Sequence, residues 1–191
     1  MSLRYVRPLM TLALLAVPAA PLAGQTTRRF LVEGRGGVSV PSGAFADAEN
    51  AGYTLGTGVG YLFARRWWAH LDYDFIRESG RFDYIHAVNN PTYGIHSVMG
   101  KLGYEVPLEP ALAVEFNLGG GVSNFRPSGQ SSLSSQTYLG MTGGARIRLL
   151  ADHRLNLVMS PEVNVAFADR AKLGERRAVM WPFSVGLQYR L

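Results

Sequence analysis

Apolar and polar residues alternate with a period of two along most of this 191-residue chain. Such alternation predicts β-strands, because successive side chains of a strand point to opposite faces. Segments rich in Gly, Ser, Asn, Asp and Pro separate the alternating stretches and are typical of turns and loops. We place eight strands at residues 29–40, 52–64, 67–79, 92–106, 111–125, 135–150, 154–168 and 176–191.

The connections between these strands alternate in length. The second, fourth and sixth connections are short, at residues 65–66, 107–110 and 151–153, and the others are long. Eight strands joined only to their sequence neighbours can close into a barrel that leaves no exposed edge. Short turns at one rim and long loops at the other are typical of outer-membrane barrels. The pattern therefore predicts an all-β fold, an eight-stranded antiparallel up-and-down transmembrane β-barrel.

Small residues indicate which face of the strands points inward. Over residues 52–64, Gly56 and Gly58 share the polar face, while Leu55 and Val59 share the apolar face. A barrel of only eight strands has little internal space, so its small residues are expected inside and its bulky ones outside. This arrangement predicts an apolar outer surface in contact with lipid. The alternative is a soluble lipocalin-like carrier with the apolar face inside, and the alternation alone leaves it open.

Aromatic residues on the apolar face fall into two bands. Amphipathic rings favour the depth of lipid headgroups, so two bands indicate the two membrane interfaces. The general preference of aromatic residues for strands is the alternative explanation. The band near the short turns contains Phe30, Phe63, Trp67, Tyr104 and Tyr189. The band near the long loops contains Tyr53, Phe75, Phe167 and Trp181.

Charged residues of both signs occupy the polar face. Seven acidic and six basic residues nearly balance, as expected of side chains that pair inside a narrow lumen. A solvated surface of alternating charges is the alternative. The predicted lumen network comprises Glu33, Arg35, Asp72, Asp74, Glu78, Lys101, Glu105, Glu115, Arg146, Arg148, Arg154, Glu162 and Arg190.

The first residues of the chain have the composition of a secretory signal peptide. Arg4 and Arg7 precede an apolar run at residues 8–17, and small residues follow. We expect a signal peptide over residues 1–24, with cleavage between residues 20 and 25. The apolar run is short compared with the ~20 residues of a membrane-spanning helix, although a retained anchor is the alternative.

The rest of the composition fits a single exported barrel domain over residues 25–191. The chain has no cysteine, which excludes disulfides and thiolate metal sites. The sequence has a net charge of +5, but the basic residues are scattered rather than clustered, so we expect no nucleic-acid partner.

An unbroken apolar stripe ends at the last residue of the chain. It resembles the C-terminal strand by which bacterial outer-membrane proteins are recognised by their barrel-assembly machinery, except that the pattern prefers a terminal Phe or Trp. With the eight strands and the signal peptide, the chain resembles the small OmpA/OmpX/OmpW-type barrel superfamily over residues 29–191. The resemblance implies an outer-membrane location among membrane lipids and lipopolysaccharide, with the assembly machinery as a partner. The end of the stripe comprises Val185, Leu187, Tyr189 and Leu191.

Two features fit the barrel less simply. Pro161 and Pro182 interrupt the last two strands, and proline cannot donate a hydrogen bond to the ladder, so we expect a β-bulge or a local break there. Arg77 falls on the lipid-facing side, which requires a position near the long-loop rim where the guanidinium reaches water.

The candidate chemistry is sparse. No nucleophile elbow, zinc-type histidine spacing or glycine-rich phosphate loop occurs, so we expect no catalytic residue, metal or cofactor. His96 and Ser97 are adjacent in a strand and point to opposite faces. A lipid-modifying enzyme with His86 beside Asp83 in a long loop is an alternative. The remaining histidines are His70 and His153.

Charged loop residues suggest two further options. Asp47 with Glu49, or Asp169 with Glu175, could bind calcium, although each loop has few acids. Residues 169–177 contain four basic residues that could meet lipopolysaccharide phosphates or an acidic partner.

The sequence therefore predicts an outer-membrane protein with a structural or surface-interaction role, four long extracellular loops that could bind an extracellular partner, and a narrow polar lumen. The alternatives are an OmpW-like channel for small solutes or apolar molecules, and a lipid-modifying enzyme.

Overall fold

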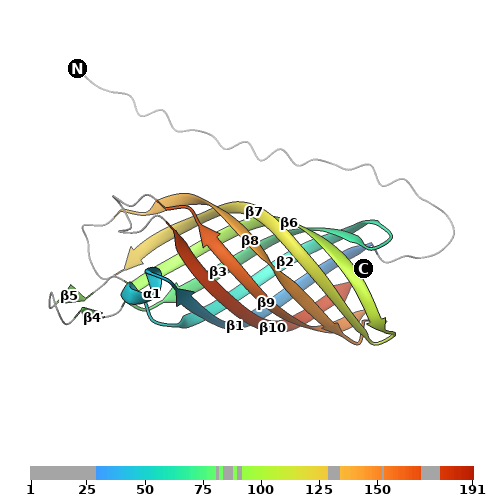
Figure 1. Cartoon of the computed structure of the whole chain (residues 1–191). Helices are drawn as coiled ribbons and strands as arrows, with labels where there is room; N and C mark the ends of the chain where they lie inside the picture. Colours follow the sequence, from blue (N-terminus) through green and yellow to red (C-terminus); the bar gives the residue numbers. More distant parts are fainter. Residues whose placement is uncertain are drawn as a thin grey trace, which may run out of the picture.

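A computed structural model describes residues 29–80, 82–83, 88–89, 92–128, 134–151, 153–168 and 177–191. Its eight long strands form one elongated closed barrel (Figure 1). These strands are β1 (Phe30–Ser42), β2 (Gly52–Ala64), β3 (Trp67–Glu78), β6 (Thr92–Glu109), β7 (Leu112–Ser128), β8 (Gln136–Leu149), β9 (Leu155–Ala166) and β10 (Ala178–Arg190). The long connections contain the short helix α1 (Phe45–Ala48) and the small hairpin of β4 (Phe82–Asp83) and β5 (Val88–Asn89).

Each barrel strand pairs antiparallel with its neighbours in the order β1-β10-β9-β8-β7-β6-β3-β2, and pairing of β1 with β2 and with β10 closes the barrel. The eight predicted strands are confirmed, and residues 52–64 have the predicted bounds. The predicted connection at 107–110 is too long, because the β6–β7 ladder continues through the pairs Pro107 with Ala113 and Glu109 with Leu112. Only Pro110 and Ala111 form the turn.

The two faces of the barrel wall have the predicted orientation. Bulky apolar side chains cover the outside, where Leu118 is 63% exposed and Leu139 is 71% exposed. Charged side chains point inward, and Glu115 and Arg146 are fully buried at 0% exposure. The soluble alternative, with an apolar lumen and a charged outside, is therefore wrong for this fold.

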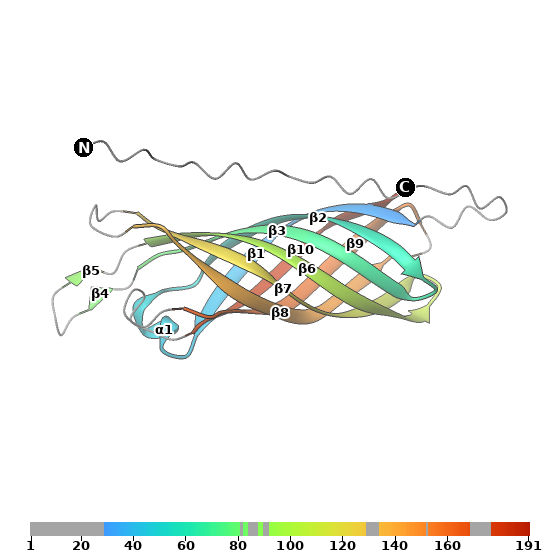
Figure 2. The same ribbon diagram turned by 90° about the horizontal axis from the view of Figure 1, so that it is seen from above.

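The two ends of the barrel differ. The C-terminus lies at one end with the short turns, while α1 and the β4–β5 hairpin lie at the other (Figures 1 and 2). Phe45 of α1 is buried, and its ring packs edge-on against Phe125 with 6.3 Å between the ring centroids. Among the described residues, no helix has the length and apolar character needed to cross a membrane. The apolar cluster at this end comprises Phe45, Ile76, Ile95, Phe125, Tyr138, Ala166, Ala178 and Met180.

The two prolines interrupt pairing without forming a bulge. In the β9–β10 ladder, the pair of Met180 with Asn164 is followed by the pair of Phe183 with Pro161, so both strands advance by three residues and the register is kept. The missing N–H group of proline removes a hydrogen bond but adds no residue to either strand. Register shifts occur instead at the short-turn ends of the β2–β3 and β6–β7 hairpins.

Candidate functional site

The middle of the barrel interior contains a network of buried ion pairs. Nζ of Lys101 on β6 lies 2.8 Å from Asp72 of β3 and 2.6 Å from Glu162 of β9. Arg35 on β1 donates to both carboxylate oxygens of Asp74, at 2.7 and 2.9 Å, and it also pairs with Glu33. Strands β6 and β9 lie three strands apart around the barrel, so the pair of Lys101 with Glu162 crosses the lumen, whereas the other pairs join side chains of the same strand or of nearby strands.

Arg146 on β8 joins the two sides of this network. Its guanidinium pairs with Asp72 and lies 3.4 Å from Glu33, while Glu115 and Glu162 are each 4.0 Å away. A buried charge is costly unless oppositely charged or hydrogen-bonding groups surround it. Arg146 therefore neutralises carboxylates from four different strands at one point of the lumen.

A second cluster lies nearer the short turns. Arg148 pairs with Glu105 and Glu115, and His70 lies 2.8 Å from Glu115. The guanidinium groups of Arg148 and Arg190 lie 5.2 and 5.4 Å from the ring centroid of Trp68, within the range of cation–π contacts. The Trp68 indole N–H donates to Glu105 at 2.7 Å. Together these side chains obstruct this end of the lumen.

Inward-facing glycines provide the space for the charged side chains. A Cβ atom on Gly56 would lie 2.3 Å from Oδ1 of Asp74, and one on Gly58 would lie 2.5 Å from Oδ1 of Asp72. A Cβ on Gly103 would lie 2.2 Å from Oε1 of Glu115. A larger residue at any of these positions would require the neighbouring carboxylate to shift. The small residues of the polar face therefore leave room for the ion pairs in this arrangement.

Most of the predicted lumen residues lie in these two clusters, but two do not. Glu78 is buried at the long-loop end, where it accepts a hydrogen bond from the Ser39 hydroxyl at 2.7 Å. Arg154 is exposed in the turn before β9, so its placement in the lumen is wrong. The alternation placed Arg154 on the inward-facing side of the strand, but the strand begins one residue later, at Leu155.

The loop acids proposed for calcium lie apart. Asp47 is exposed, while Glu49 is buried beside the apolar cluster, so they do not form a common site. Burial, together with the neighbouring Glu78 carboxyl, raises the pKa of Glu49 to about 8. Asp169 and Glu175 lie outside the described residues. Over the described ranges, no group of three or more His, Cys, Asp or Glu side chains is placed to hold a metal ion.

The histidines have separate surroundings. His70 belongs to the buried network. Its position two residues before Asp72 puts both side chains on the same face of the strand, and this could have indicated that role. His96 lies on the outer face with its Nδ1 atom 2.7 Å from the Tyr73 hydroxyl, while Ser97 points inward to Ser123 at 2.8 Å. His153 is exposed in a short turn. His86, the candidate for catalysis, lies outside the described residues.

The aromatic residues of the two predicted bands face outward or lie at the outer surface of the wall. Trp67 and Tyr104 are cross-strand neighbours with 5.0 Å between ring centroids, and Tyr53 and Phe75 are 6.0 Å apart. The others are Phe30, Phe63, Phe167, Trp181 and Tyr189.

The C-terminal stripe also faces outward, along the strand that closes the barrel. Val185 and Leu187 are exposed on β10, and Leu191 follows its end. The Leu191 N–H donates to the Phe30 carbonyl at 2.9 Å, so the last residue is held against the first strand.

The outer membrane protein beta-barrel domain family matches residues 9–160, which is more than half of the chain. The chain belongs to this family. It is therefore a small outer-membrane β-barrel protein with transmembrane strands. No curated protein is a significant match to its sequence.

Solved structures support the same fold. The barrel is similar to neisserial surface protein A, with a TM-score of 0.68 and 12% identity over 85% of this chain and 97% of that one. It is also similar to OprG from Pseudomonas aeruginosa, with a TM-score of 0.63 and 14% identity over 85% and 95%. A major outer membrane protein from Thermus thermophilus has a TM-score of 0.55 and 14% identity over 85% and 98%. At these identities, the similarity concerns the fold alone.

Proposed function

We propose that this protein is a non-conducting outer-membrane barrel with a structural or surface-interaction role. The observation that supports this proposal is the filled interior. Trp68 with its two arginines obstructs the short-turn end, the ion pairs cross the middle, and the apolar cluster around Phe45 fills the long-loop end. We further propose that residues 1–24 direct export and are cleaved.

The energetics of the ion pairs argue against conduction through the lumen. A solute would have to separate Lys101 from Glu162, and Arg35 from Asp74, to pass the middle of the barrel. Leaving one buried charge without its partner costs about 3–5 kcal/mol. Several such pairs would have to open together, so we expect the OmpW-like channel alternative to fail for passage through the lumen.

With the lumen filled, the long-loop rim is the surface left for contact with a soluble partner. The four long connections, at residues 43–51, 79–91, 129–135 and 167–177, follow strands that run toward the same end of the barrel. We propose that this end faces the cell exterior and displays the loops to an extracellular partner. The outward apolar stripe on β10 is then the surface that the barrel-assembly machinery recognises during insertion, and the two aromatic bands lie at the membrane interfaces.

Single-channel recording in planar bilayers tests the proposal. The refolded wild-type barrel should give no discrete conductance steps, whereas a general porin inserted under the same conditions provides the positive control. A Lys101→Ala/Glu162→Ala variant should conduct more than the wild type, because it removes both partners of an ion pair that crosses the lumen. Steady conductance steps from the wild-type protein would overturn the proposal.

We propose no catalytic activity. Of the described histidines, His70 is buried inside the barrel and His96 contacts the Tyr73 hydroxyl. Neither of these two has a serine hydroxyl beside it that it could activate as a nucleophile. A phospholipid and lipid A hydrolysis assay on the wild type tests this point. Activity that disappears in a His86→Ala variant would establish the enzymatic alternative.

A further inference from the structure

Two exposed arginines flank a glycine on the outer face near the long-loop rim. The β-ladders pair Arg77 of β3 with Gly94 of β6, and Gly94 with Arg126 of β7, so the three residues form one row across adjacent strands. Gly94 has no side chain, so only the edge of the Phe75 ring, 3.5 Å from where a Cβ of Gly94 would lie, borders the outer surface between the two arginines. Neither arginine forms an ion pair with another described residue.

This row lies at the polar edge of the apolar outer surface. The outward residue that precedes Arg77 on β3 is Phe75, and Val122 is outward on β7 four residues before Arg126. Between Val122 and Arg126, Asn124 accepts a hydrogen bond from the Arg126 Nε–H at 2.9 Å. The change from apolar to polar side chains along each strand places the arginines at the depth of the lipid headgroups.

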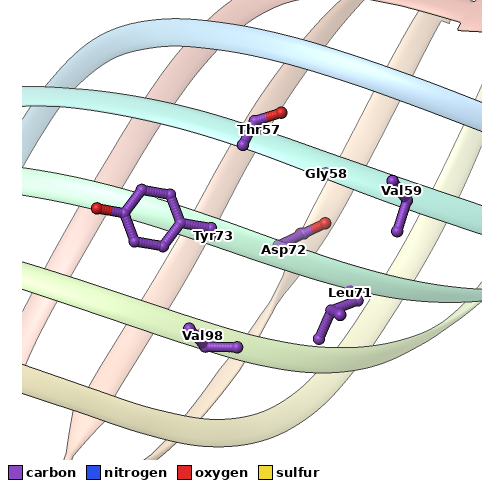
Figure 3. Close-up of a pocket in the computed structure, with 7 residues that line it drawn as sticks. All are labelled: Thr57, Gly58, Val59, Leu71, Asp72, Tyr73 and Val98. Carbon is purple, nitrogen blue, oxygen red and sulfur yellow. The ribbon is translucent and has the colours of Figure 1, made fainter. Parts of the chain in front are cut away.

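The outer surface is hollowed on the membrane side of this row. A depression of about 230 Å³ lies over β2, β3 and β6 (Figure 3). The exposed side chains of Val59, Leu71, Tyr73 and Val98 surround it. The hydrogen bond between Tyr73 and His96 lies between this hollow and the arginines, since His96 is two residues from both Val98 and Gly94 along β6. An apolar hollow and a cationic row therefore lie on the same face of the barrel, with the Tyr73–His96 pair between them.

We propose that this face binds an anionic lipid of the outer leaflet, with a headgroup phosphate held between Arg77 and Arg126 and an acyl chain in the hollow. The inference rests on the proposed orientation, in which the long loops face the cell exterior. A guanidinium fork matches the geometry of phosphate oxygens, and the two positive charges lack an acidic partner in the described structure. A chain that enters the hollow from the arginine row runs along the outer wall toward the membrane centre, as a lipid does.

Titration with lipid A tests the site, because lipid A carries both phosphates and acyl chains. The barrel is held in zwitterionic detergent, and native mass spectrometry measures the fraction with lipid A bound. The test variant is Arg77→Gln/Arg126→Gln. The matched control is Arg65→Gln/Arg66→Gln, which removes the same charge from exposed residues in a short turn at the opposite rim. A basic residue beside an anionic membrane surface contributes enough for a roughly fivefold loss per arginine, so the double variant should bind roughly 30-fold more weakly.

Two further binding measurements distinguish the contribution of the phosphate headgroup from that of the acyl chain. Dephosphorylated lipid A should bind the wild type as weakly as lipid A binds the double variant, and inorganic phosphate alone should compete poorly. Val98→Trp fills the hollow at an outward position and should weaken lipid A binding without changing the heat-dependent gel shift that reports the folded barrel.

Equal lipid A affinity in the wild type and the Arg77→Gln/Arg126→Gln variant would overturn the site. Equal weakening by the Arg65→Gln/Arg66→Gln control would also overturn it, since the effect would then reflect overall charge. Either result leaves the conductance test of the proposed function unaffected, so the two failures are distinguishable.

Discussion

Replacing Arg146 with methionine should strongly destabilise the barrel. Methionine keeps much of the length of the side chain but removes the charge that faces Asp72, Glu33, Glu115 and Glu162. The two interior clusters contain six carboxylates, from Glu33, Asp72, Asp74, Glu105, Glu115 and Glu162, and five positive side chains apart from His70, from Arg35, Lys101, Arg146, Arg148 and Arg190. Arg146→Met therefore leaves six carboxylates facing four positive side chains.

The magnitude follows from the burial of these groups. Removing one partner of a buried ion pair costs about 3–5 kcal/mol, because the remaining charge is left without compensation. Arg146 is 0% exposed, so water cannot replace it without opening the wall. Since whole domains are stable by only about 5–15 kcal/mol, this loss is a large part of the total.

Urea unfolding of the refolded barrel in lipid bilayers measures the effect through the fluorescence of the three tryptophans. Arg154→Met is the matched control, because it removes the same charge from an exposed turn and should change the free energy of unfolding by less than about 0.5 kcal/mol. Adding Asp72→Asn to Arg146→Met should cost less than the sum of the two single changes, since the pair is coupled. A loss below about 1 kcal/mol for Arg146→Met, well short of the cost of an uncompensated buried charge, would refute the buried network as a stabilising plug.

Two further predictions concern space and protonation. Gly103→Val should push the Glu115 side chain away from Arg148 and destabilise the barrel by about 1–3 kcal/mol in the same assay, whereas Gly34→Val, where a Cβ meets nothing within 4 Å, should have little effect. The raised pKa of Glu49, about 8 against 4.5 for an ordinary Glu, means that the folded state favours the protonated carboxyl. Its stabilisation is complete below pH 4.5 and is lost as the pH rises to about 8, so hydrogen exchange around α1, corrected for the intrinsic pH dependence of amide exchange, should accelerate between pH 4.5 and about 8. Glu49→Gln should remove this acceleration, and an unchanged pH dependence in that variant would show that another group is responsible.

The strands were predictable because each one carries a two-residue period over many positions. Residues 52–64 were predicted with the bounds of β2, since the alternation continues to both ends of that strand. The ends of β6 and β7 were missed because Pro107 resembles a turn signal, although it occupies a paired position. Similarly, Pro161 and Pro182 interrupt hydrogen bonds without shifting register, and only the pairing partners reveal that difference.

The interior was less predictable than the wall. The alternation placed Lys101 and Glu162 on the same face, but it could not show that these side chains meet in the lumen, because their strands, β6 and β9, are far apart in sequence and do not pair in the sheet. Trp68 was missed because an inward tryptophan contradicts the general rule for a polar lumen, and its two arginines come from β8 and β10. Helix α1 is only four residues long, too short to produce a helical period.

The central claim is that lipid contacts the apolar face while the charged side chains are enclosed by the wall. Photolabelling with a diazirine-bearing phospholipid in bilayers, followed by peptide mass spectrometry, tests it directly. Along β7 the label should fall on outward residues such as Phe116 and Leu118 and should spare the inward Glu115, although carboxylates react readily with carbenes. Labelling of Glu115 with Leu118 unlabelled would contradict the account.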